Sequence, residues 1–65
     1  MDAKNELERI LAESGGGSLT VLRDTDVPFP WYRGELLLDK PFGIYTASAA
    51  SEHDVLLSLL REAAA

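Results

Sequence analysis

Apolar side chains recur along the chain with two different periods, which predict helices at both ends and strands between them. Near the N-terminus they fall at i, i+4, i+7 and i+8, the spacing of one helical stripe: Ala3, Leu7, Ile10 and Leu11. Asp2 is a suitable N-cap, because its carboxylate can accept from the first free backbone N–H groups. We therefore predict a helix over residues 3–14, ended by the run Gly15-Gly16-Gly17.

A second helix is predicted over residues 52–63. Its apolar face holds side chains at helical spacing: Val55, Leu56, Leu59, Leu60 and Ala63. Ser51, followed three residues later by Asp54, resembles a capping box at its start. Leu57 falls about 130° from the centre of the apolar face. We therefore expect Leu57 to lack a partner within the subunit and to contact another protein.

Between the helices, alternating and β-branched segments predict strands over residues 19–23, 31–39 and 43–47. Short turn sequences separate them, so the strands should form an antiparallel meander. An unbroken second strand would turn one set of side chains toward the core: Tyr32, Gly34, Leu36 and Leu38. The other set would face the opposite side: Trp31, Arg33, Glu35 and Leu37. Gly34 is also a candidate β-bulge, which would swap the two sets upstream of it.

The segment from Val27 to Tyr32 combines prolines with aromatic residues. Pro28 and Pro30 exclude a central strand here, because they lack the N–H donors of a ladder, so we expect an exposed extended segment. Phe29, Trp31 and Tyr32 then form a presented contact surface, with Trp31 as its anchor. The alternative is that Trp31 closes one end of the core of the subunit.

Together these elements predict an α+β fold. It consists of a helix, a three-stranded antiparallel meander and a second helix, in one small domain over residues 1–65, with both helices on one face of the sheet. The uninterrupted triplet Leu36-Leu37-Leu38 places at least one leucine on the other face. We expect a second copy or another protein to cover that face.

Composition makes self-association the expected supplement to a small core. A chain of 65 residues buries a limited fraction of its surface, and this one has no cysteine and a single histidine, which excludes disulfides and thiolate zinc sites. A net charge of -5 disfavours nucleic acid and suits a basic protein partner. No apolar run is long enough to cross a membrane, so we expect a cytoplasmic protein.

Candidate catalytic chemistry is sparse. His53 lies among the residues that should cap the second helix, so a small hydrolase is only a third hypothesis. Asp24 and Asp26 are interpreted as turn residues, because Asp competes for nearby backbone N–H groups. We therefore expect no catalytic, cofactor-binding or metal-binding residues.

The sequence favours a small, acidic, non-catalytic protein-interaction module that forms a homodimer, with Phe29, Trp31, Tyr32 and Leu57 as partner-binding residues. The alternative function is a module that binds single-stranded nucleic acid. It would stack bases on sheet aromatics and hold the backbone with Arg23, Arg33 and Lys40. Against it, acidic residues balance the basic ones in this region.

Overall fold

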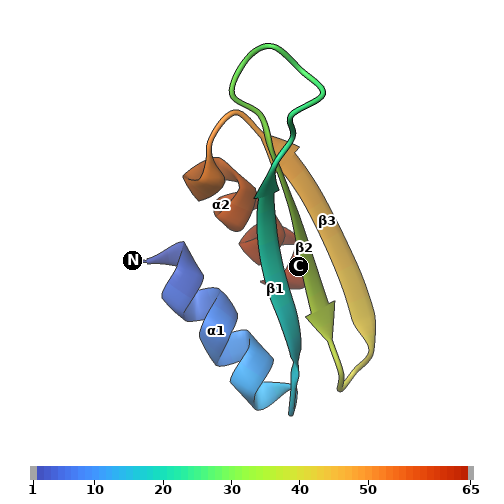
Figure 1. Cartoon of the computed structure of the whole chain (residues 1–65). Coiled ribbons are helices and arrows are strands. Elements are labelled where there is room, and N and C mark those ends of the chain that lie inside the picture. Colours follow the sequence, from blue (N-terminus) through green and yellow to red (C-terminus); the bar gives the residue numbers. More distant parts are fainter. Residues whose placement is uncertain (1, 65) are drawn as a thin grey trace.

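The fold is α+β, as predicted: two helices pack on one face of a three-stranded antiparallel sheet. A computed structural model describes residues 2–64. The element order is α1 (Ala3–Glu13), β1 (Gly17–Arg23), β2 (Tyr32–Leu38), β3 (Gly43–Ala49) and α2 (Glu52–Ala64). The strands lie in the order β1-β2-β3, and both helices lie on the same side of them (Figure 1).

Two strands are longer than the sequence predicted. β1 begins at Gly17, because Gly17 and Ser18 pair with the end of β2 although neither residue favours a strand. Gly17 has φ 130° and lies so close to the Leu37 carbonyl that a side chain would not fit. β3 continues to Ala49, because β2 offers a partner as far as Tyr32.

The register of β2 is unbroken, so the predicted bulge at Gly34 is wrong. Gly34 pairs with Val21 on one side and with Ala47 on the other, in step with its neighbours. The glycine serves helix packing instead. A Cβ atom at this position would overlap Val55 Cγ1 and lie 3.0 Å from Leu59 Cδ1, both on α2. The missing side chain therefore lets α2 approach the sheet closely.

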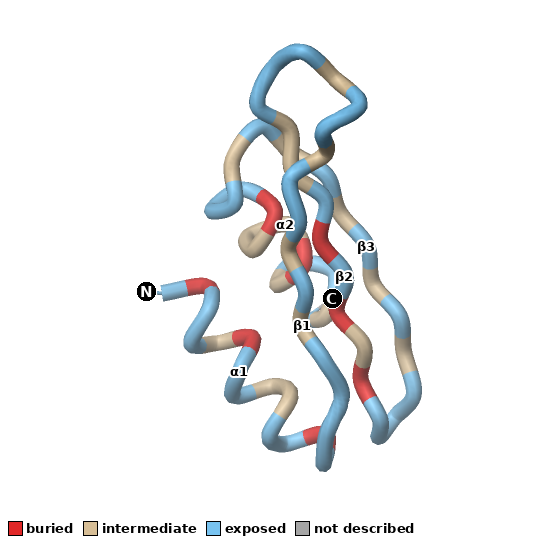
Figure 2. The backbone as a smooth tube through the Cα atoms, viewed as in Figure 1, coloured by how far each residue is buried: buried red, intermediate tan, exposed pale blue. Residues whose placement is uncertain are grey.

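The core lies between β2 and the two helices. Its buried hydrophobic residues come from α1, β2 and α2: Ala3, Leu7, Leu36, Leu38, Val55 and Leu59. Figure 2 shows these buried positions on the three elements, whereas β1 and β3 hold only partly buried and exposed ones. β1 and β3 form the two edges of the sheet, and β3 carries no charged side chain.

Three predicted caps and turns are confirmed. Asp2 Oδ1 accepts from the Lys4 backbone N–H at 3.0 Å and begins α1. Ser51 Oγ accepts from the Asp54 backbone N–H at 3.1 Å at the start of α2. Asp24 Oδ1 accepts from the Asp26 backbone N–H at 2.9 Å, which is the local turn expected of these residues.

The charged side of α1 faces solvent. Arg9 donates to Glu6 at 2.6 Å and to Glu13 at 2.9 Å, which are the three- and four-residue spacings that bring side chains together on a helix surface. The hydrogen bond with Glu6 and the charges of both carboxylates raise the pKa of Arg9. Within residues 2–64, neither helix has the length and hydropathy that crossing a membrane would require.

Candidate functional site

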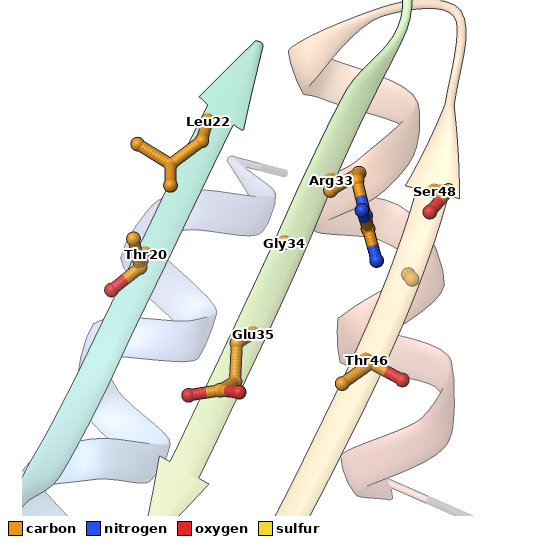
Figure 3. Close-up of a pocket in the computed structure, with 8 residues that line it drawn as sticks. Thr20, Leu22, Arg33, Gly34, Glu35, Thr46 and Ser48 are labelled. Atoms are coloured by element: carbon orange, nitrogen blue, oxygen red, sulfur yellow. The ribbon is translucent and has the colours of Figure 1, made fainter. Parts of the chain in front are cut away.

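The face of the sheet opposite the helices is the candidate contact surface, here called the open face. Its side chains come from alternate positions of all three strands: Ser18, Thr20, Leu22, Arg33, Glu35, Leu37, Ile44, Thr46 and Ser48. The strand register arranges them in three rows across the sheet. Leu22, Arg33 and Ser48 form one row, and Thr20, Glu35 and Thr46 form the next (Figure 3). Neither α1 nor α2 covers these rows.

Large apolar side chains lie at both ends of the open face. Leu22 on β1 is 66% exposed, and Ile44 on β3 is 56% exposed. Leu37, paired with Ile44, is half-buried and is the leucine of the triplet that the sequence assigned to this face. Leu22 and Ile44 are therefore large apolar side chains exposed on a sheet face that neither α1 nor α2 covers.

The centre of the open face is a shallow hollow of about 550 Å³, bounded by the side chains of Figure 3. Its volume falls within the range of small-molecule sites, but such sites enclose their ligand in mostly apolar walls. Here the hollow lies on an open sheet, and five of its eight lining residues carry hydroxyl or charged side chains: Thr20, Arg33, Glu35, Thr46 and Ser48. This shape fits contact with another surface better than capture of a small molecule.

Two opposite charges stand in this hollow. Arg33 and Glu35 are exposed, lie two residues apart on β2 and share the open face. Neither forms an ion pair with another described residue. Their charged groups are therefore free to pair with a partner.

Two of the four predicted partner-binding residues lie together beside this face. Phe29 and Trp31 belong to the segment that joins β1 to β2, and their rings meet edge to face at 6.0 Å between centroids and 86° between planes. Phe29 is 52% exposed and Trp31 is half-buried. The Asp24 backbone N–H donates to the Trp31 carbonyl at 2.8 Å, so the pairing of β1 with β2 extends by one step. Alternation then places Trp31 on the side of Arg33.

The other two predicted residues lie elsewhere. Tyr32 is partly buried and packs against the core, so the structure places it on the helix side of the sheet rather than beside Trp31. Leu57 is on α2, in the helical layer, and is half-buried rather than free of neighbours. One flat interface cannot contain both Leu57 and the open face, because the sheet separates them.

Most residues of the open face were missed as contact residues because each is ordinary by itself. Thr20, Leu22, Ile44, Thr46 and Ser48 carry no side-chain chemistry that marks a binding residue within its own strand. The signal that could have found them is the alternation of all three strands, combined with the rule that two short helices cover one face only.

The residues proposed for nucleic-acid binding are dispersed. Arg33 is on the open face, Arg23 is at the end of β1, and Lys40 is in the turn at the far end of β2. Tyr32 and Tyr45 pack against the core, so their rings are not presented for base stacking. These two tyrosines are therefore not available as a base-stacking platform on the sheet.

The groups considered for catalysis also do not converge. His53 is exposed in the first turn of α2, and the adjacent Ser51 hydroxyl is engaged with the helix backbone. Residues 2–64 contain no cluster of three or more His, Asp or Glu side chains suited to holding a metal ion. Comparisons with protein-family models, with curated proteins and with solved structures found no match to this chain.

Proposed function

We propose that this chain is a small, acidic, non-catalytic protein-interaction module that self-associates through the open face of its sheet. The observation that carries the proposal is the exposure of Leu22 and Ile44, 66% and 56%, on a sheet face that has no covering layer. Full burial of such a side chain is favourable by about 1.5–3 kcal/mol. A dimer that covers the open face therefore gains this burial energy, which a monomer cannot gain because these side chains stay in contact with water.

The Phe29–Trp31 pair extends this surface beyond the sheet. Both rings lie in a segment in which Pro28 and Pro30 restrict the backbone, so less conformational entropy is lost when a partner orders it. Trp is also among the residue types most enriched at the energetic centres of interfaces. We keep Phe29 and Trp31 as partner-binding residues for these reasons.

The charge of the chain completes the proposal. A net charge of -5 would attract a basic protein to the rest of the surface, in addition to the second copy on the open face. The absence of cysteine fits a cytoplasmic location, which we propose as well. The separate positions of His53 and the carboxylates support a role without catalysis.

Sedimentation equilibrium across about 1–500 µM tests self-association. The range extends to high concentration because the contact area of one three-stranded sheet is small, and small interfaces are commonly weak. The average mass of the wild-type chain should exceed the 7.1 kDa of the monomer and should rise with concentration toward twice that value. Leu22→Asp should weaken association at least about tenfold, because it places an unpaired carboxylate in the interface. Leu22 is exposed in the subunit, so the circular dichroism of the variant should be unchanged.

Leu57→Glu is the matched control, since it also replaces a leucine with an acid but lies on α2. We expect it to leave association unchanged, provided that circular dichroism shows a folded chain. A wild-type chain that stays monomeric over the whole range would overturn self-association. If Leu57→Glu dissociates the dimer and Leu22→Asp does not, the interface lies on the helical layer rather than on the open face.

A further inference from the structure

Read in reverse, the open-face side chains of β2 and of Trp31 just before it keep the same pattern except that the two charges change places. Starting from the segment before the strand, they are Trp31, Arg33, Glu35 and Leu37: apolar, positive, negative, apolar. Reversed, the order is apolar, negative, positive, apolar. A strand with this pattern is complementary to an antiparallel copy of itself, and charge complementarity of this kind fixes which surfaces meet.

The rest of the open face is compatible with the same arrangement. Arg33 and Glu35 are the only charged residues among the nine that define the open face, so these nine are together neutral although the whole chain has a net charge of -5. Asp24, which pairs with Trp31 beyond the end of β1, adds one negative charge at the rim. Most of the excess negative charge therefore lies elsewhere, and two copies can bring their open faces together with little repulsion there. The flanking strands contribute hydroxyl groups and exposed apolar side chains to the contact.

Charge also selects one of the two symmetric ways to stack the sheets. A two-fold axis parallel to the strands would place each Arg33 opposite the same residue of the other copy. An axis across the strands, between Arg33 and Glu35, places each charge opposite its counter-charge. The sheets of such a sandwich lie about 10 Å apart and cross at about 30°. Arg33 and Glu35 lie within about 4 Å of the axis, so the crossing angle displaces them little relative to their partners in the other copy.

We propose that the partner on the open face is a second copy of this chain, related by a two-fold axis across the strands between Arg33 and Glu35. Arg33 pairs with the partner's Glu35, and Glu35 with the partner's Arg33. Trp31 and Leu37 exchange apolar contacts at the two ends of β2 in the same reciprocal way. This arrangement rests on the proposed self-association, and it specifies which residues of the two copies contact each other.

The flat area of the contact limits its strength. Three strands about 4.8 Å apart, each rising about 3.3 Å per residue, give a projected face of roughly 300 Å². This is small beside the roughly 800 Å² per partner of a standard interface. We therefore expect micromolar rather than nanomolar association, in which loss of two ion pairs has a large effect on the dimer.

Charge reversal tests the arrangement with the intact chain. Arg33→Glu gives a subunit with two acids on this face, and Glu35→Arg gives one with two bases. Either variant alone would form a dimer with two like-charged pairs, so each should associate at least about tenfold more weakly than wild type. An equal mixture of the two should form a 1:1 heterodimer with an affinity close to that of the wild-type dimer.

The double variant Arg33→Glu/Glu35→Arg restores both pairs within one chain and should dimerise again. Both residues are exposed, so circular dichroism should show folded subunits throughout. Single variants that dimerise as wild type does, or a mixture that stays monomeric, would overturn the two-fold arrangement. If Leu22→Asp still dissociates the dimer in that case, the open face remains the contact surface. A monomeric wild type would instead remove the proposed self-association itself.

Discussion

Trp31 and Tyr32 are neighbours in the chain with opposite environments. Tyr32 packs against the core beneath the helices, whereas Trp31 is half-buried and contacts Phe29 in the segment before β2. Among the described residues, Trp31 is not one of the partly buried side chains that pack on the core. This favours a role for Trp31 in contacts with a partner over closure of the core.

Truncation of these two neighbours should therefore have different effects. Trp31→Ala should weaken self-association while lowering the free energy of unfolding of the subunit by about 1 kcal/mol, the scale of one lost aromatic pair. Tyr32→Ala should lower it by about 3 kcal/mol, as expected for a large side chain removed from a core. Urea unfolding at low protein concentration measures the free energy of unfolding of the subunit, and sedimentation equilibrium measures self-association. A loss of 3–5 kcal/mol for Trp31→Ala would instead assign Trp31 to the core.

Alternation along a single strand was enough to predict which side of β2 each residue faces. The structure confirms the assignment of Leu36 and Leu38 to the core and of Leu37 to the opposite face. Leu57 was less predictable. Helical periodicity gives the direction of a side chain relative to the apolar stripe, but partial burial depends on neighbouring elements that periodicity does not place.

At the level of elements, Gly34 shows how packing changes the meaning of a residue. A glycine within a strand is commonly a sign of a bulge or of close approach by another backbone or side chain. The sequence left the bulge open as an alternative, because the contact with Val55 joins residues far apart in the chain. Only the placement of α2 across β2 reveals that the position must lack a side chain.

Gly34→Ala should destabilise the subunit by about 1–3 kcal/mol, because the added methyl group overlaps Val55 and crowds Leu59. Val55→Ala removes the overlapping methyl groups and should be destabilising by itself through the cavity it leaves. Chemical denaturation of the two single variants and the double variant measures their coupling. We expect the double variant to be more stable than the sum of the single changes predicts. Simple additivity would show that α2 does not rest on Gly34.

For the whole molecule, the order of elements and the placement of both helices on one face could be predicted from periodicity, caps and turn residues. Asp2, Ser51 and Asp24 fulfil the roles that their chemistry suggested. The composition of the open face could not be predicted as a surface, because it depends on the register among three strands. The pairing of Leu22 with Arg33 and of Arg33 with Ser48 is a tertiary property.

The unpaired edges of the sheet have a consequence for colloidal behaviour. A face-to-face dimer leaves the outward backbone groups of β1 and β3 unpaired, and β3 has no charged side chain to discourage a fourth strand from joining its edge. The net charge of -5 is then the main barrier to lateral growth at neutral pH. That barrier vanishes near the isoelectric point of about 4.5.

Light scattering and thioflavin T fluorescence should therefore stay low at pH 7 and rise together as the pH approaches 4.5. Scattering without thioflavin fluorescence would indicate amorphous precipitation and contradict growth through the edges. On this view the acidic residues of the helices and turns prevent further strands from adding to the edges of each sheet. The charge of the helical layer thus limits polymerisation of the sheet layer.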